Sequence, residues 1–128
     1  MPRFSAHSLN ELESCDDQLQ YILFEAIKYI DFSVLCGRRS KKEQEELVRR
    51  GFSKTLKSKH LIMPSQAVDI APYPINWKDE RRFVYFAGFI MAIAASKDIK
   101  LRWGGDWDND TDLKDQRFND LGHFELIE

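Results

Sequence analysis

The sequence predicts a small α+β fold in which helices pack on a mainly antiparallel sheet. Three observations support this prediction. Apolar residues recur at helical spacing in two separate segments, four apolar runs are too short for a large parallel sheet, and helices come before and between these runs. The 128 residues contain no repeat and no linker rich in Pro, Gly or Ser, so we expect one domain over residues 1–128.

The chain is predicted to begin with two helices. Ser8, followed three residues later by Glu11, matches a capping box and predicts a short helix that ends near Cys15. Asp16 can cap a second helix over residues 17–29, because apolar residues recur there every three or four positions. That apolar face is expected to belong to the core.

A strand, a charged helix and a second strand follow. Residues 32–36 are apolar and stop at Gly37, which predicts a strand. Ser40 can cap a charged helix that ends near Arg50, with little apolar surface to bury. Residues 52–66 are expected to form a long loop. Residues 67–71 predict the second strand, which the turn Pro72-Tyr73-Pro74 ends.

The last third of the chain predicts one helix and two strands. The helix covers residues 79–97, and its apolar stretch 83–95 is too short for the roughly 20 residues that span a membrane. We therefore expect a buried core helix and no membrane partner. Strands are predicted over residues 100–103 and 123–127, and a loop rich in Asp, Asn and Gly over residues 104–119.

Composition narrows the function classes. The net charge of -2 gives no overall field toward nucleic acid, and two cysteines, Cys15 and Cys36, are too few for a disulfide scaffold. The first 13 residues are polar and do not resemble a signal peptide. We expect a monomeric protein that is made in the cytoplasm and keeps free thiols.

Three residues suggest a metal site. His60, Asp69 and His123 provide two imidazoles and a carboxylate, a ligand set that Zn²⁺ accepts while it leaves a fourth position for water. Asp120, three residues before His123, can act as a general base on that water. Taken singly, a loop histidine is more often a surface residue and such an aspartate more often belongs to a turn.

Five motifs occur in an order that is typical of one family. They are GRR at 37–39 with Gln44, SKH at 58–60, AVD at 67–69, WGGDW at 103–107 and DLGHFEL at 120–126. Over residues 34–126 the chain resembles zinc peptidases of the D-alanyl-D-alanine carboxypeptidase family, most closely the phage L-alanyl-D-glutamate endopeptidases, or endolysins. The resemblance implies the α+β fold that these peptidases share with the hedgehog signalling domain.

The resemblance also implies roles for single residues. The zinc ligands of the family match His60, Asp69 and His123, and its catalytic acid/base matches Asp120. Its arginine, which holds the substrate carbonyl or carboxylate, matches Arg39. One departure is the interval from His60 to Asp69, which is nine positions here and therefore two longer than usual. We expect a surface loop to absorb the extra residues.

Three further residues are candidates for substrate binding. Ser58 belongs to the SKH motif, where it can steady the loop or serve as a plain turn residue. Trp103 can line the substrate cleft or pack in the core. Gly104 lets a peptide ligand approach the backbone closely.

Alternating aspartates suggest a calcium site. The residues are Asp106, Asp108, Asp110 and Asp112. A true EF-hand is excluded, because Thr111 and Arg117 stand where that loop needs Gly and Glu. A looser Ca²⁺ site and a solvated acidic loop both remain open.

The residues predict hydrolysis of an amide by a zinc enzyme, and the resemblance implies that the substrate is the peptide stem of peptidoglycan, cut at the L-alanyl-D-glutamate bond. As a phage endolysin it would reach the wall of its host after another protein opens the membrane. One alternative is a D-alanyl-D-alanine carboxypeptidase on the same site. Others are a non-catalytic wall-binding module and, from the basic residues between 38 and 59, a nucleic-acid-binding patch, although glutamates interrupt that run.

Overall fold

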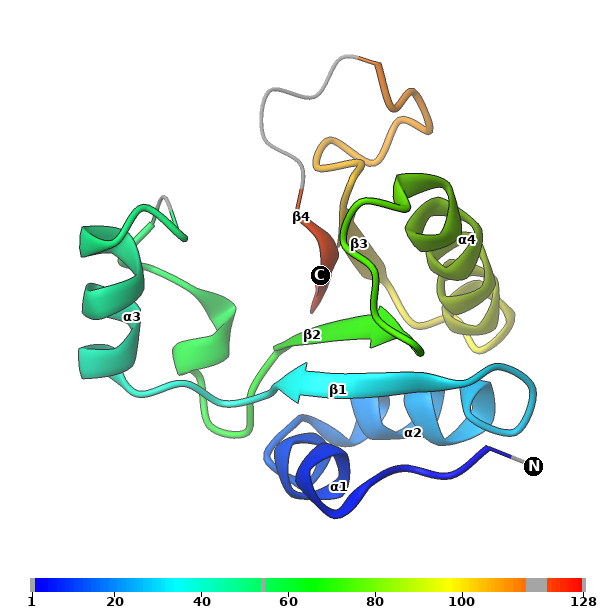
Figure 1. Cartoon of the computed structure of the whole chain (residues 1–128), viewed down its shortest axis with the longest axis horizontal. Coiled ribbons are helices and arrows are strands. Elements are labelled where there is room, and N and C mark those ends of the chain that lie inside the picture. The colour runs from blue at the N-terminus through cyan, green and yellow to red at the C-terminus, as the bar shows by residue number, and fades with distance from the viewer. Residues whose placement is uncertain (1, 54, 115–119, 128) are drawn as a thin grey trace.

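The computed structural model describes residues 2–53, 55–114 and 120–127. Within these residues it contains four α-helices, one short 3-10 helix (η1) and one antiparallel sheet with the strand order β1-β2-β4-β3 (Figure 1). The elements are α1 (Ala6–Glu13), α2 (Asp17–Ala26), β1 (Phe32–Cys36), α3 (Lys41–Arg49), η1 (Lys59–Leu61), β2 (Ala67–Pro72), α4 (Glu80–Ser96), β3 (Leu101–Gly104) and β4 (Asp120–Leu126). The α+β fold with a small antiparallel sheet is confirmed.

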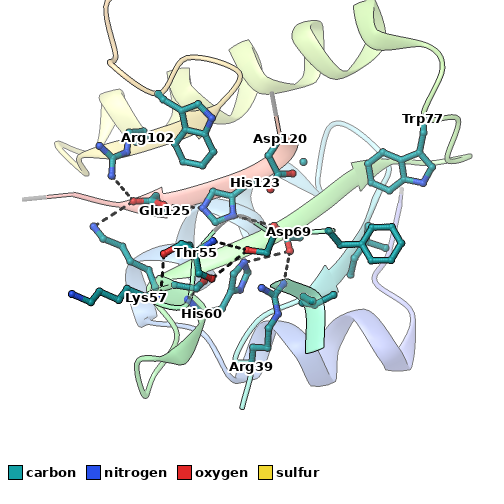
Figure 2. Close-up of a pocket in the computed structure, with 18 residues that line it drawn as sticks. Arg39, Thr55, Lys57, His60, Asp69, Trp77, Arg102, Asp120, His123 and Glu125 are labelled. Atoms are coloured by element: carbon teal, nitrogen blue, oxygen red, sulfur yellow. Dashed lines mark hydrogen bonds and ion pairs between the residues drawn. The ribbon is translucent and has the colours of Figure 1, made fainter. Parts of the chain in front are cut away.

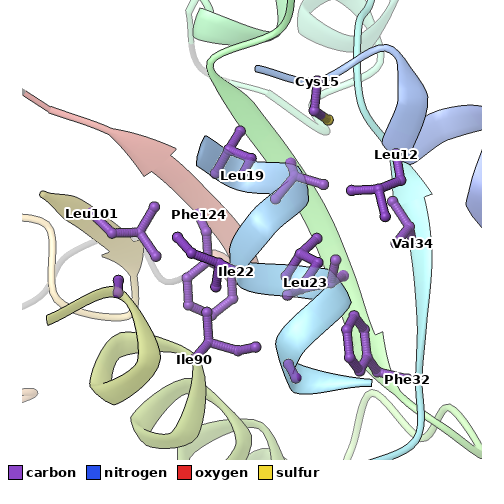
Figure 3. Packing of buried hydrophobic residues seen from close by; sticks show 14 of the residues in the cluster. Leu12, Cys15, Leu19, Ile22, Leu23, Phe32, Val34, Ile90, Leu101 and Phe124 are labelled. Atoms are coloured by element: carbon purple, nitrogen blue, oxygen red, sulfur yellow. The ribbon is translucent and has the colours of Figure 1, made fainter. Parts of the chain in front are cut away.

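One face of the sheet forms the hydrophobic core. Side chains of α1, α2 and α4 pack there against alternate residues of all four strands, as Figure 3 shows for Ile22, Ile90 and Phe124. Alternation follows from the pleat, which points successive side chains to opposite faces. Complete burial of one such side chain contributes about 1.5–3 kcal/mol, so this face supplies most of the stability.

The other face of the sheet is polar. Asp69 of β2, Arg102 of β3 and both His123 and Glu125 of β4 alternate with core residues and therefore point away from the core. α3 and η1 lie on the side of the molecule opposite α4, beyond the end of β1 (Figure 1). Thr55 and Lys57, from the segment between these two helices, line the same cavity as the polar-face residues.

The first helix begins earlier than the sequence predicted. Its N-cap is Ser5, whose side chain accepts from the backbone of Ser8, so the predicted capping box at Ser8 and Glu11 is wrong. Ser8 is instead buried, and its Oγ accepts a hydrogen bond from the Val34 backbone at 2.9 Å. The predicted Ser40 cap of α3 is confirmed, with Glu43 completing a capping box.

The last strand also begins earlier than predicted, at Asp120 rather than His123. Asp120 pairs with Gly104 of β3, and a Cβ at Gly104 would lie 2.0 Å from the Asp120 carbonyl oxygen. Only a glycine at position 104 permits this close approach. It lets Asp120 pair as part of a strand, although the sequence Asp-Leu-Gly at 120–122 is typical of a turn. As a result, His123 lies in the middle of β4 and Asp120 at its start.

The long interval between His60 and Asp69 folds back on the N-terminal helices. Ser65 donates its backbone N–H to Ser14 at 2.9 Å and accepts from Asp16 at 2.8 Å. Gln66 accepts from the backbone of Leu126 at 2.8 Å. The interval is thus tied to α1, α2 and β4. Among the described residues no helix is both long and apolar enough to cross a membrane.

Candidate metal centre and active site

Asp69 lies at the centre of the polar face, between two imidazole rings (Figure 2). The register of β2 and β4 places His123 directly opposite Asp69, and Nδ1 of His123 lies 3.2 Å from Oδ1 of Asp69. His60 comes from η1, and its Nε2 lies 3.3 Å from Oδ2 of the same carboxylate. Asp69 and His60 thus meet His123 at one point, although they precede it by 54 and 63 positions in the sequence.

Neighbouring acceptors decide which nitrogen each histidine presents to Asp69. Nδ1 of His60 donates to the Gly37 carbonyl at 2.6 Å, so Nε2 is the nitrogen that faces Asp69. Nε2 of His123 donates to Oε1 of Glu125 at 2.9 Å, so Nδ1 is the nitrogen that faces Asp69. Histidines that bind metals are commonly oriented in this way, by a carbonyl or carboxylate on the second nitrogen.

Gly37 has to be a glycine for the carbonyl to reach His60. A Cβ at Gly37 would lie 2.2 Å from the Glu11 carbonyl oxygen and 2.3 Å from the Ser14 hydroxyl. The backbone of the GRR motif therefore packs directly on the end of α1. This contact fixes the acceptor that orients His60.

Arg39 is held against Asp69 by α3. Its Nη2 lies 3.1 Å from Oδ2 of Asp69, and its Nη1 donates to Gln44 at 2.6 Å. Gln44 is the one buried residue of α3, with 1% of its surface exposed, and it also donates to Ser53 and to the Thr55 carbonyl. The main contribution of α3 to the site is therefore to place the Arg39 guanidinium.

The electrostatics of the centre favour a negative Asp69 and positive histidines. Burial opposes the charge on Asp69, but the two histidines beside it hold its pKa far below the usual range. Burial likewise opposes the charge on His60, but the neighbouring Asp69 and Cys36 raise its pKa to about 10. The carboxylate thus prefers a cationic neighbour, whether an imidazolium or a metal ion.

Asp120 has the opposite environment. Burial and then the negative charge of Asp69 raise its pKa above the ordinary value for aspartate. A carboxyl group with a raised pKa accepts and returns a proton more readily near neutral pH, as a general acid/base requires. The structure thus places the predicted acid/base beside the predicted ligands.

Glu125 is a site residue that the sequence analysis missed. Besides accepting from His123, it accepts from Arg102 at 2.7 Å and lies 3.6 Å from Nζ of Lys59. Burial opposes its charge, but hydrogen bonds from His123 and Arg102 lower its pKa to about 2. The signal was present in the alternation of β4, because a glutamate two residues after a site histidine must share its face.

These residues line a cavity of about 550 Å³, a size typical of ligand sites. Arg39, His60, Asp69, Asp120 and His123 all contribute to it, so the structure brings every predicted ligand and catalytic residue together. Four of the described lysines and arginines line the cavity: Arg39, Lys57, Lys59 and Arg102. Such a wall suits a ligand that carries carboxylates.

The three candidates for substrate binding have different positions. Ser58 lines the cavity, and its Oγ caps η1 by accepting from the His60 backbone at 3.2 Å. Trp103 is instead a core residue, 5% exposed, and its indole donates to the Leu121 carbonyl. Gly104 lies against the backbone of Asp120 rather than against ligand space. A strand that alternates between two faces sends Trp103 to the core when its neighbour Arg102 faces the site.

Two other tryptophans line the cavity. Trp107 lies with its ring centre 5.3 Å from that of His123. Trp77 is 58% exposed and stacks on Phe83, with ring centres 5.0 Å apart. In Figure 2, Trp77 and Lys57 lie on opposite sides of the ligand residues. The cavity thus has aromatic as well as cationic walls.

The donor set is compatible with a metal ion. Potential ligand atoms form two groups here, and within each group they lie within 4.8 Å of one another. One group is Cys36, His60 and Asp69, and the other is Asp69, Asp120 and His123. Asp69 belongs to both groups. Nε2 of His60 is buried and has no hydrogen-bond partner among the described residues, and a cation bound to it would satisfy this nitrogen.

The acidic loop also gathers possible ligands. Carboxylate oxygens of Asp106, Asp108 and Asp110 lie within 4.8 Å of one another, whereas Asp112 is outside this group and accepts from the Lys114 backbone. Asp106 accepts from the backbones of Asp110 and Thr111, which shapes the loop by itself. Calcium binding there stays a prediction from the sequence. Arg117 of the excluded EF-hand pattern lies outside the described residues.

Comparisons with known proteins give the family of the chain. Residues 1–127 match the model of the phage L-alanyl-D-glutamate peptidase family. The L-alanyl-D-glutamate peptidase of Escherichia phage T5 is 29% identical over 136 residues, which cover 98% of each chain. The L-Ala D-Glu endopeptidase ChiX of Serratia marcescens has a similar crystal structure, with a TM-score of 0.78 and 32% identity over 98% of this chain and 90% of ChiX. The chain therefore belongs to the phage L-alanyl-D-glutamate peptidase family.

Proposed function

We propose that this chain is a zinc peptidase that hydrolyses the L-alanyl-D-glutamate bond in the peptide stem of peptidoglycan. The observation that carries the proposal is the Asp69 carboxylate between two oriented imidazoles, in a cavity that also holds Asp120 and Arg39. Membership in the family and the names of both relatives support the choice of bond.

His60, Asp69 and His123 would hold the ion through Nε2, a carboxylate oxygen and Nδ1. Two nitrogens and one carboxylate oxygen form a common donor set of catalytic zinc sites. Zinc in such a site acts as a Lewis acid, which makes water more acidic and polarises a carbonyl group. The hydrogen bonds to Gly37 and Glu125 keep both rings in the tautomers that this set needs.

Asp120 and Arg39 would carry the proton and the charge. Asp120 accepts the proton of the attacking water and returns it to the amine of D-glutamate as the peptide bond breaks. Arg39, held by Gln44, donates to the carbonyl oxygen of L-alanine, on which negative charge develops. The remaining carboxylate of D-glutamate would face Lys57, Lys59 and Arg102.

The biological role in this proposal is that of an endolysin. The protein would be made in the host cytoplasm, act as a monomer because one chain supplies every site residue, and reach the wall after another protein opens the membrane. The match to a family of phage peptidases supports this role. Expression in bacteria with and without a membrane-opening protein tests it, since rapid lysis should require both proteins.

The decisive experiment is mass spectrometry of fragments that the purified protein releases from peptidoglycan, together with its zinc content. We expect one zinc ion per chain and new termini at L-alanine and D-glutamate. Chelation and His123→Ala should abolish release, whereas His7→Ala, a matched change at an exposed histidine, should not. Loss of terminal D-alanine alone would favour the carboxypeptidase. Tight wall binding without any product would favour the binding module.

A further inference from the structure

One sulfur atom lies beside the candidate ligands and has no role in the proposed reaction. Cys36 is the last residue of β1, and its Sγ lies within 4.8 Å of ligand atoms of both His60 and Asp69. Donors on one zinc ion lie at such separations, because Zn–S and Zn–N bonds are about 2.3 and 2.0–2.1 Å long. The Arg39 guanidinium also donates to this sulfur, at 3.5 Å.

A β-bulge directs Cys36 to the site. Val34 pairs with Ile70 but Cys36 pairs with Asp69, so Leu35 is an extra residue on β1. In an unbroken register Cys36 would lie opposite Val68, whose side chain packs in the core. A shift of one residue moves a side chain to the other face, and bulges beside active sites commonly redirect side chains in this way.

His60 supplies an independent indication of a ligand at this point. The residue is 1% exposed, and its Nε2 has no hydrogen-bond partner in the described part of the chain. Its Nδ1 already donates to Gly37, so Nε2 is the nitrogen left to face the carboxylate of Asp69, 3.3 Å away. A buried polar atom without a hydrogen-bond partner is costly, and a cation bound between Nε2 and the carboxylate would remove that cost.

We propose that Cys36, as a thiolate, is a fourth protein donor to the ion held by His60, Asp69 and His123. This inference rests on the proposed zinc site. When the ion binds, the thiol proton passes to solvent. A thiolate favours Zn²⁺ over Mg²⁺ and Ca²⁺, and four protein ligands make a closed site. Without substrate, the chain would therefore hold its metal tightly, and the thiolate would have to give up its place on the ion for a water molecule to bind there.

Cobalt substitution of the purified full-length chain tests this proposal without an activity measurement. Wild type with Co²⁺ should show the visible bands of a tetrahedral ion and an intense thiolate-to-cobalt band in the near ultraviolet. Cys36→Ser should keep the visible bands and lose the ultraviolet band. Cys15→Ala is the matched control, since Cys15 is a core residue with 2% exposure, and it should retain both.

Zinc affinity and thiol labelling give two further measurements. Cys36→Ser should weaken zinc binding at least about tenfold, because even partners that merely orient a ligand are worth 10–100-fold. Zinc should also slow the alkylation of Cys36 by iodoacetamide, as mass spectrometry of the labelled peptide would detect.

The outcomes separate this inference from the proposed function. Cobalt that binds with visible bands but without the thiolate band, or a thiolate band that persists in Cys36→Ser, overturns the role of Cys36 and leaves the zinc peptidase standing. Equal alkylation with and without zinc also contradicts the inference. A chain that releases wall peptides but binds neither cobalt nor zinc overturns the zinc site and the role of Cys36 together.

Discussion

On β4, Phe124 and Leu126 lie on one face of the sheet, and His123 and Glu125 lie on the other. Both faces are covered, since His123 and Glu125 are each only 7% exposed. The core face gains stability from apolar burial. The polar face buries charges, which is favourable only because each has partners of opposite charge or a hydrogen bond. The comparison indicates that the core face stabilises the fold, whereas the polar face carries the candidate ligands and catalytic residues.

The largest effect should come from the polar face, through Asp120→Asn. Without a general acid/base, kcat should fall on the order of 10³-fold, within the range of such groups. The zinc content and the midpoint of urea unfolding should stay close to wild type, because the amide keeps the shape of the side chain. The rate of wall-peptide release measures kcat, elemental analysis measures the zinc content, and urea titration measures the unfolding midpoint. Activity near that of wild type would remove Asp120 from the mechanism.

A core substitution should show the reverse pattern. Ile90 of α4 is fully buried, and Ile90→Ala should lower the free energy of unfolding by about 3 kcal/mol, since it removes apolar contacts and leaves a cavity. At a temperature where the variant is folded, kcat per folded molecule should be unchanged. Urea titration measures the free energy of unfolding, and enzyme kinetics measures kcat. A large loss of kcat in folded protein would mean that the faces are coupled.

Glu125 tests whether the polar face orients its ligands. Glu125→Leu removes the acceptor for Nε2 of His123 and should weaken zinc binding about 10–100-fold. Glu125→Gln keeps an acceptor oxygen, so its zinc affinity should lie between that of wild type and that of Glu125→Leu. Competition with a chelating dye measures the affinities. Equal affinity in all three would show that the ring needs no partner.

The smallest effect should come from Cys15, on the core face of the sheet. Burial in the core raises the pKa of the Cys15 thiol from 9.0 to about 12. The neutral thiol therefore contributes stability that is complete below pH 9 and is lost as the pH rises toward 12. Near pH 10 the loss should be about 1.4 kcal/mol. Urea titrations at pH 8 and 10 should show this added loss in wild type and not in Cys15→Ala.

Much of the site could be predicted from the sequence, because its residues lie in short motifs of chemically distinctive types. His60, Asp69, His123, Asp120 and Arg39 were all named in advance, and they line one cavity. Their roles stay predictions until the metal and the products are measured. The positions of Trp103 and Gly104 could not be predicted, because a residue at the end of a strand can face either side.

The sequence by itself determined the fold class, most of the element boundaries and the candidate ligands, since each depends on local spacing and residue type. Only the tertiary structure decided three other features: the tautomers of His60 and His123, the orientation of Arg39 by Gln44, and the position of Cys36 beside the ligands. Each depends on strand register, on a bulge or on a contact between distant segments. Such contacts arise from packing of the whole chain, which no local pattern records.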